Sequence, residues 1–322
     1  MCRNIRVDLD RLIVRFRQFG GWRLLRAYAD MGVLWPGLKA LLRCAVTRRS
    51  FKAVYPVITR RVDEILLEKY GAISGASVCG EQSEARGDSA KAPSGCIWFC
   101  WLQGLTEAPP LVRACLESQQ RCFGKETVIV LDDENYTQWV TLPGYVVEKY
   151  HKGIMPAAMF SDLLRLELLL RYGGTWIDST VLVTRKVRIP DCELMLYRYF
   201  RNNRVEGISN WFIHANPGNP LLADVQAMLL AYWKDYDCTV EYYMMHLFFS
   251  HAARRYPAMM AAMPKVNAYH ALILRDMLHK PFDADKWQEL TERVPIHKLN
   301  YRLADKAARN ADSYYNHIVS EE

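Results

Sequence analysis

Hydrophobic and polar residues follow a different pattern in each of four successive parts of the chain. In residues 1–70, apolar residues recur at helical spacing with arginines between them, which predicts basic amphipathic helices. Residues 71–95 are small, polar and rich in Gly, Ser and Ala, so we expect a flexible linker or loop. In residues 96–302, short apolar runs alternate with helical patterns, which favours an α/β core. We expect a short polar helix or tail over residues 303–322.

The first part of the α/β core has the pattern of a strand, a helix and a second strand. The strands are IWFCWL and ETVIVLDD, and the helix between them is LVRACLESQQRCF. Such a unit is typical of a parallel sheet. Neither a G-x-G-x-x-G fingerprint nor a P-loop accompanies it, so the sequence does not support a Rossmann dinucleotide site or a Walker site.

The segment SDLLRLELLLRYGGTWIDST, residues 161–180, predicts an apolar helix, a Gly-Gly break and a short strand. Asp162 and Arg165 are three residues apart and therefore share one face of the helix. If this face is buried, the pair needs polar partners, which a sugar and its ribose would supply; the alternative is a surface ion pair. Asp178 ends the strand, where α/β proteins place ligand chemistry, although such an Asp can also cap a turn.

This segment resembles the SD-x-x-R … GG-x-Y-x-D-x-D signature of glycosyltransferases of family thirty-two, especially their bacterial capsular polysaccharide synthesis branch. The resemblance implies a Rossmann-like nucleotide-sugar-binding core of GT-A type with a helical N-terminal extension. It also implies that the catalytic residues Asp162 and Arg165 bind the ribose and sugar of the donor. Asp178, as the first carboxylate of the D-x-D motif, would bind a divalent metal at the diphosphate.

Thr180 replaces the last carboxylate of that motif. Mn²⁺ and Mg²⁺ prefer oxygen ligands, so Asp178 and Thr180 are the candidate ligands of either ion. One carboxylate contributes roughly a few kcal/mol at an effective dielectric constant of about 20, so we expect weak metal affinity without substrate. The resemblance makes His297 a candidate additional ligand, and an ordinary hydrogen-bonded histidine is the alternative. Lys298 beside it would instead bind the diphosphate.

Aromatic residues supply candidate contacts to the rest of the substrates. The resemblance places a base-stacking aromatic in the first core strand, with Trp98 as the first choice and Trp101 as the alternative. Asn210 and Trp211 are candidates for the acceptor side, because aromatic rings stack on sugars. For each tryptophan, packing in the core is the competing interpretation.

Charge and cysteine usage indicate where in the cell the protein is expected. The net charge is +7, but residues 1–61 carry fourteen Lys and Arg against three Asp and Glu, a net of +11 that leaves −4 for the remainder. Such a segment either binds an anionic membrane surface or forms a helical subdomain with a solvated basic face. The chain has no apolar run of transmembrane length and no signal-peptide pattern, and its nine cysteines are scattered as in proteins with reduced thiols. We therefore expect a cytoplasmic protein, which the membrane alternative would make peripheral at the inner face of the cell membrane.

Together these features predict a glycosyltransferase that moves a hexose from a nucleotide diphosphate sugar to a capsular or surface polysaccharide acceptor. We expect the acceptor to be lipid-linked, and the resemblance alone implies retention of configuration without a protein nucleophile. One alternative is a non-catalytic subunit that binds sugar nucleotides or glycans, which the missing second Asp favours. Another is a membrane scaffold built on the basic helices. Nucleic-acid binding lacks a recognition motif.

Overall fold

The computed structural model describes residues 16, 19–47, 54–75, 92–202, 204–303 and 310–320. The chain divides into two units whose segments alternate along it, whereas the sequence predicts successive parts. The first unit combines residues 1–81, 142–164 and 220–255, and the second combines residues 82–141, 165–219 and 256–322. The beginning of the N-terminal amphipathic pattern and most of the expected linker lie outside the described residues.

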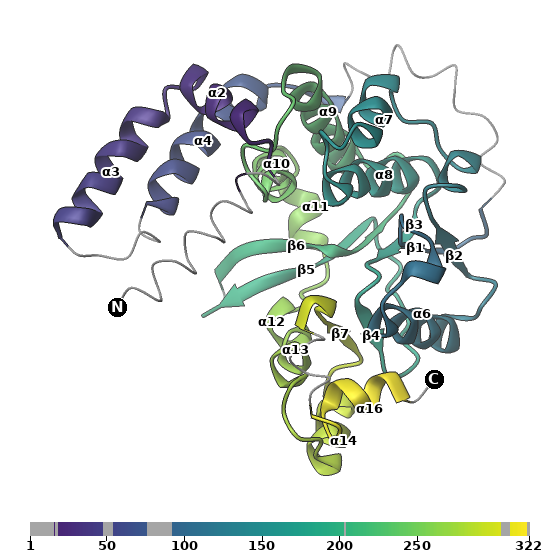
Figure 1. Cartoon of the computed structure of the whole chain (residues 1–322). Helices are drawn as coiled ribbons and strands as arrows, with labels where there is room; N and C mark the ends of the chain where they lie inside the picture. Colours follow the sequence, from purple (N-terminus) through teal and green to yellow (C-terminus); the bar gives the residue numbers. More distant parts are fainter. Residues whose placement is uncertain are drawn as a thin grey trace. The chain divides into compact units, whose positions relative to one another are not determined.

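The first unit is helical, and α9 forms its centre (Figure 1). Within it α4, α7 and α10 all contact α9, whose buried side chains include Leu221, Val225 and Trp233. The helices α2, α3 and α4 confirm the helical prediction for the part of residues 1–70 that is described. The helices of this unit are α2 (Trp22–Asp30), α3 (Leu34–Val46), α4 (Tyr55–Tyr70), α7 (Gly144–His151), α9 (Pro220–Asp235), α10 (Met244–Ala252), the short η7 (Ala253–Arg255) and the first half of α8 (Ala157–Tyr172).

The start of the expected linker is attached to α9. Asp224 is buried, and its Oδ1 accepts hydrogen bonds from the backbone N–H of Gly75 at 2.8 Å and from the hydroxyl of Ser74 at 2.9 Å. Its Oδ2 pairs with Nη1 of Arg255 at 2.8 Å. Because a buried carboxylate needs such partners, residues 71–75 belong to the folded unit and not to a linker.

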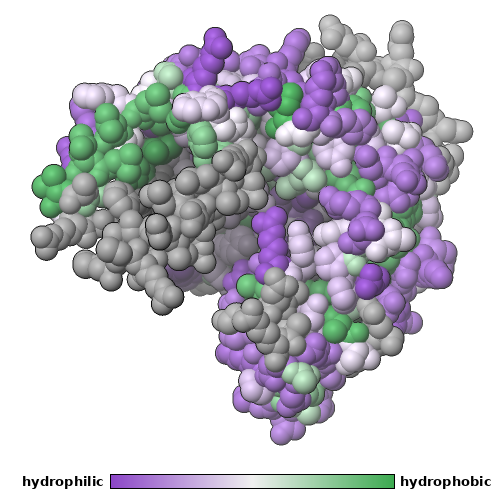
Figure 2. All heavy atoms as spheres, in the orientation of Figure 1, coloured by the Kyte–Doolittle hydropathy of each residue, from purple (hydrophilic) through white to green (hydrophobic). Residues whose placement is uncertain are grey.

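One face of α3 is apolar and exposed, and it appears as a green area in Figure 2. The spacing of these residues is that of an amphipathic helix, yet the apolar stripe faces away from the core of its unit. Cys44, on another side of the helix, is buried. The exposed apolar residues of α3 are Leu34, Trp35, Leu38, Leu41, Leu42 and Val46.

The second unit contains a mixed sheet of five strands in the order β2-β1-β3-β6-β5. β1 runs parallel to both β2 and β3, and β6 runs antiparallel to both β3 and β5. The helix α6 (Pro110–Phe123) connects β1 to β2 and confirms the predicted strand–helix–strand unit. An α/β sheet of this kind agrees with the expected GT-A type core. The strands are β1 (Ile97–Cys100), β2 (Val128–Leu131), β3 (Gly174–Ile177), β5 (Leu194–Arg201) and β6 (Arg204–Ala215).

A second, two-stranded sheet joins distant parts of the sequence in this unit. β4 (Val181–Val183) pairs antiparallel with β7 (Ile296–Lys298), so that Val181 lies opposite Lys298 and Leu182 lies opposite His297. α6 supports β4, because the side chain of Gln119 donates to the carbonyl of Val181 at 2.9 Å. β7 therefore pairs with the strand that directly follows the predicted site segment.

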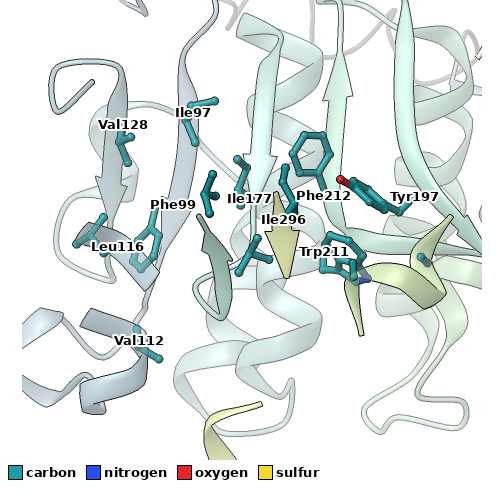
Figure 3. Packing of buried hydrophobic residues seen from close by; sticks show 14 of the residues in the cluster. Ile97, Phe99, Val112, Leu116, Val128, Ile177, Tyr197, Trp211, Phe212 and Ile296 are labelled. Atoms are coloured by element: carbon teal, nitrogen blue, oxygen red, sulfur yellow. The ribbon is translucent and has the colours of Figure 1, made fainter. Parts of the chain in front are cut away.

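The hydrophobic core of the second unit lies between the large sheet, α6 and the small sheet (Figure 3). Phe99, Ile177 and Phe212 come from three neighbouring strands, and Ile296 comes from β7. Burying a side chain of this size contributes about 1.5–3 kcal/mol, so the core fixes the strand ends that carry the site.

The C-terminal part of the second unit differs from the polar helix expected there. α16 (Tyr314–Ser320) contacts α6 and buries Tyr314, Tyr315 and Ile318, while residues 304–309 lie outside the described residues. The seven cysteines in the described ranges are free thiols. None of the helices described here combines the length and apolarity that a membrane span requires. The other short elements are η5 (Leu105–Glu107), η6 (Tyr136–Gln138), α11 (Pro257–Ala262), α12 (Ala268–Ala271), α13 (Ile273–Met277), α14 (Ala284–Arg293) and η8 (Tyr301–Leu303).

Candidate functional site

The predicted Gly-Gly break brings β3 close to β1. Gly173 and Gly174 have φ angles of 68° and 85°, in the left-handed region that favours glycine. A Cβ on Gly174 would lie 2.5 Å from the carbonyl oxygen of Cys96, so a larger residue does not fit there. The break therefore positions β3, and with it Asp178, at the carboxyl end of the parallel strands.

Asp178 is the centre of a charged cluster. Its Oδ2 lies 2.7 Å from Nζ of Lys298, and its Oδ1 lies 3.5 Å from Nη1 of Arg165. The indole N–H of Trp176 donates to the same Oδ1 at 2.8 Å. The Lys298 ammonium also donates to Oγ1 of Thr180 at 2.7 Å. These residues come from α8, β3, the turn after β3, and β7, and they form what we call the Asp178 cluster: Arg165, Trp176, Asp178, Thr180 and Lys298.

Arg165 makes two further contacts besides the one with Asp178. It donates to the backbone carbonyl of Asn210 on β6, and its guanidinium lies over the ring of Trp176 with the carbon 4.7 Å from the ring centroid. Its side chain is only 6% exposed. Cation–π contact and charge-assisted hydrogen bonds of this kind fix the guanidinium in one orientation.

The cluster keeps Asp178 ionised. Burial favours the neutral acid, but the positive charges of Lys298 and Arg165 and the hydrogen bonds from Lys298 and Trp176 outweigh it and lower the pKa to about 2. With Asp178 negative and two cations beside it, the cluster has a net charge of +1. It is therefore suited to an anionic ligand.

The predicted metal site is only partly assembled. Asp178 and Thr180 come together, but His297 lies on the opposite face of the small sheet, because neighbouring residues of a strand point to opposite sides. There it is fully buried beside Leu182, neither ring nitrogen makes a hydrogen bond of ordinary geometry, and burial lowers its pKa to about 4. This environment favours a buried core histidine, and a role for His297 as a metal ligand stays a prediction.

The described residues fit a divalent metal poorly in another respect. No three His, Cys, Asp or Glu residues within them are grouped as metal ligands would be. In addition, the Lys298 ammonium occupies the place between the two oxygens that a metal would have to share. Binding of Mn²⁺ or Mg²⁺ stays a prediction.

Asp162, the partner of Arg165 in the sequence motif, is buried one turn earlier on α8. The boundary between the two units falls within this helix, after Leu164, so Asp162 is counted with the first unit. Its spacing from Arg165 agrees with the predicted shared helix face. Its role as a donor-binding residue stays a prediction.

Of the two tryptophans considered for base stacking, the first choice is buried and the alternative is partly exposed. Trp98, the first choice for base stacking, is fully buried, and its indole N–H donates to the carbonyl of Gly173 at 2.9 Å. A side chain in the core offers no face to a base, so the structure favours core packing for Trp98, and base stacking by a tryptophan of this strand stays a prediction. Trp101 follows the end of β1, is half-buried, and meets Tyr301 edge to face at 5.4 Å.

The acceptor-side candidates lie on β6 beside Asp178. The backbone N–H of Asp178 donates to the carbonyl of Trp211 at 2.9 Å. Trp211 is buried against Tyr197, with ring centroids 4.5 Å apart, whereas Asn210 is half-buried. Packing in the core therefore accounts for Trp211, and only Asn210 remains partly accessible.

Sequence reasoning did not identify three residues that shape the site. Trp176 anchors both Asp178 and Arg165, Gln119 holds the turn after Asp178, and Tyr301 faces Trp101. The feature that marks Gln119 is its complete burial, which the sequence alone does not reveal.

Comparison with known proteins finds a matching family model and two partial relatives. A family model described as capsular polysaccharide synthesis protein matches residues 48–318. The chain is 27% identical over 146 residues to "O-glycosyltransferase braB" of Annulohypoxylon truncatum and 30% identical over 101 residues to "O-glycosyltransferase PaGT" of Phomopsis amygdali. These matches cover 39% and 29% of this chain, and only 34% and 25% of the relatives' own lengths.

Among solved structures, one called "PaToxG Glycosyltransferase" is a match. It matches with a TM-score of 0.37 and 15% sequence identity, over 76% of this chain and 96% of that one.

Proposed function

The chain belongs to the family of capsular polysaccharide synthesis proteins, and we propose that it transfers a hexose from a nucleotide diphosphate sugar to a capsular or surface polysaccharide acceptor. The observation that carries this proposal is the Asp178 cluster, with its net positive charge at the carboxyl end of the parallel strands. Ligands of α/β sheets bind at this edge. A diphosphate leaving group is the anion that the reaction requires there.

In the proposed reaction, the bond between the anomeric carbon and the diphosphate oxygen breaks, and a bond to the acceptor hydroxyl oxygen forms. The hydroxyl proton passes to the leaving phosphate, so retention needs no protein nucleophile. Arg165 and Lys298 stabilise the negative charge that develops on the diphosphate, because their cations are already fixed in place. Asp178 holds both cations in position, and Asp162 contributes to binding the donor's ribose and sugar.

Trp101 is our candidate for the surface on which the nucleotide base stacks. It is half-buried, it follows the end of β1 directly, and its contact with Tyr301 leaves the aromatic pair next to the strand that carries Lys298. Aromatic rings provide a sequence-tolerant stacking surface for bases. Trp101→Leu should therefore raise the KM for the donor more than it lowers kcat.

The proposed activity is tested by donor hydrolysis and transfer with a panel of uridine- and guanosine-diphosphate hexoses. Asp178→Asn should lower kcat on the order of 100-fold, because the two cations lose the acid that positions them. The matched control is Asp283→Asn, since Asp283 also pairs with a lysine, Lys286 at 2.6 Å, but at the exposed N-terminus of α14. Equal turnover by wild type and Asp178→Asn would refute the role of the cluster.

The second candidate function is a non-catalytic sugar-nucleotide or glycan-binding subunit. It is favoured by Thr180, which leaves Asp178 as the only carboxylate of the motif. Binding of a nucleotide sugar without hydrolysis or transfer, across a panel of glycan acceptors, would support this function over the enzyme.

We further propose that α3 places the protein on an anionic membrane, where a lipid-linked acceptor would be found. The exposed apolar stripe of α3 lies beside two exposed cations, Lys39 and Arg43, which complement anionic headgroups. Trp35 is 62% exposed, and the ammonium of Lys39 lies 5.2 Å from the centroid of its ring. Aromatic rings of this kind are enriched at membrane interfaces.

Sedimentation with phosphatidylserine vesicles tests the membrane proposal. The double substitution Leu38→Glu with Leu42→Glu should lower partitioning at least roughly tenfold, because burial of each leucine is worth about 1.5–3 kcal/mol. Ile273→Glu introduces an acid at a similarly exposed apolar position on α13 and should bind as wild type does. Unchanged binding of the α3 variant would exclude this surface.

A further inference from the structure

We propose that Lys298 takes the place of the divalent cation of the D-x-D motif, so that the chain binds the donor's diphosphate through two fixed side-chain cations and without a metal. This inference rests on the proposed function and specifies how its site handles the charge of the donor. It is carried by the position, the support and the accessibility of the Lys298 ammonium.

The position of Lys298 coincides with the expected metal position. Nζ lies 2.7 Å from Oδ2 of Asp178 and 2.7 Å from Oγ1 of Thr180, which are the first and last residues of the motif. A metal that bridges these two oxygens would have to displace the ammonium. It would then lie close to two positive charges, those of Lys298 and Arg165, whose repulsion would oppose its binding.

The residue at position 180 decides the charge of the cluster. With an aspartate there, two carboxylates would balance the two cations, and no positive charge would be left for a ligand. With Thr180 the cluster keeps one positive charge, and the threonine hydroxyl still accepts a hydrogen bond from Lys298. The neutral residue that weakens a metal site is therefore the residue that an ammonium site requires.

The backbone holds Lys298 in place before any ligand binds. Its strand β7 pairs with β4, opposite Val181, and the N–H of Leu299 donates to the carbonyl of Thr180 at 2.8 Å. The N–H of Val181 in turn donates to the carbonyl of Asp178 at 3.0 Å. Preorganised charges of this kind need no rearrangement when negative charge develops on a leaving group.

Lys298 also remains accessible to a ligand. Its side chain is 21% exposed and that of Asp178 is 22% exposed. An ammonium has three N–H donors, and only two are directed at Asp178 and Thr180, which leaves one for a phosphate oxygen. Arg165 is less exposed and acts from the inner side of the cluster.

The test is calorimetric binding of uridine diphosphate and guanosine diphosphate to the full chain, in EDTA and in Mn²⁺. Wild type should bind one of them with a Kd that differs less than about twofold between the two conditions, and binding should weaken with salt. Lys298→Met should weaken binding at least roughly tenfold, as expected for the loss of a charge-assisted hydrogen bond. Lys298→Arg should retain part of the affinity. Lys286→Met removes an exposed lysine that is also paired with an aspartate, and it should leave the Kd unchanged.

A second variant tests the proposal in the opposite direction, and its result does not depend on whether Lys298→Met folds. Thr180→Asp combined with Lys298→Ala restores two carboxylates and removes the ammonium, so nucleoside diphosphate binding should now require Mn²⁺. If this variant binds in EDTA as wild type does, the proposal is wrong. It is equally wrong if EDTA abolishes wild-type binding and Mn²⁺ restores it, although the proposed transferase function would then stand. If wild type binds neither nucleotide under either condition, both proposals fail.

Discussion

The ion pair between Asp178 and Lys298 should contribute measurably to the free energy of unfolding. Asp178→Asn leaves two cations beside a neutral side chain, and Lys298→Met leaves the carboxylate with Arg165 and Trp176. Each single variant therefore contains a charge that has lost a partner, whereas the double variant contains the intact Arg165 with a neutral neighbour. We expect the two substitutions to be strongly non-additive.

The magnitude follows from the pKa of Asp178. Its value falls from 3.8 to about 2 on folding, and at about 1.36 kcal/mol per pH unit this difference corresponds to about 2.4 kcal/mol. The side chain is partly exposed, so we expect a loss of about 2 kcal/mol for Asp178→Asn at pH 7. Because the folded pKa is the lower one, this contribution is present above pH 3.8 and is lost as the pH falls towards 2.

The assay is thermal unfolding of wild type, both single variants and the double variant at pH 7 and low salt. With an unfolding entropy of about 2.1 cal/mol/K per residue, about 2 kcal/mol lowers the Tm of a chain of 322 residues by about 3 °C. The double variant should lie above the sum of the single effects by about 1–3 kcal/mol, the usual coupling energy of contacting charges. Strictly additive losses would refute the reasoning, because they would mean that Asp178 and Lys298 do not interact.

Three further predictions concern other parts of the structure. Gly174→Ala should lower stability by more than about 2 kcal/mol, because its φ is positive and its Cβ would clash with Cys96, whereas Gly218→Ala, also at positive φ but with open space around it, should cost only about 1 kcal/mol in the same thermal unfolding assay. Burial and the charges of Glu241 and Glu64 raise the pKa of Asp63 to about 6, so the free energy of unfolding should fall as the pH rises from about 4 to 6. Asp63→Asn should remove this fall and raise the free energy of unfolding at pH 8 by about 1–3 kcal/mol, as measured by urea titration at several pH values. Asp224→Asn should release residues 71–75, seen as faster amide hydrogen exchange at Gly75 with little change in α14.

The sequence predicts those elements of the fold whose pattern is local. The unit β1-α6-β2 and the path from α8 through Gly173 and Gly174 into β3 are confirmed, because each depends on periodicity and glycine placement within about twenty residues. The sequence pattern could not predict which helices pack together in the first unit. α9 packs on helices from both ends of its unit, and only the folded chain shows which apolar faces meet. For the same reason the expected polar helix at the C-terminus turned out to bury Tyr314 and Ile318.

The candidate site shows the same limit at the scale of single residues. Arg165 and Asp178 were predicted together and lie together, because one helix and one strand carry them. The choice between His297 and Lys298 depended on the register of β7 against β4, and a shift of one residue exchanges the faces. The choice between Trp98 and Trp101 depended on where β1 ends, since a parallel strand is buried on both faces and only residues beyond it reach the site.

Register therefore connects two observations that are puzzling when each is considered alone. Thr180 considered alone indicates a metal-binding motif that lacks its second carboxylate, and Lys298 considered alone indicates one cation for binding a diphosphate. The pairing of Val181 with Lys298 places the ammonium against Thr180, so the two residues form one arrangement. In that arrangement a second carboxylate would cancel the charge that the ligand needs, and a shorter or neutral side chain at position 298 would leave Asp178 and Thr180 without their common partner. The motif is thus complete in a different chemical form, one in which the cation is covalently part of the chain.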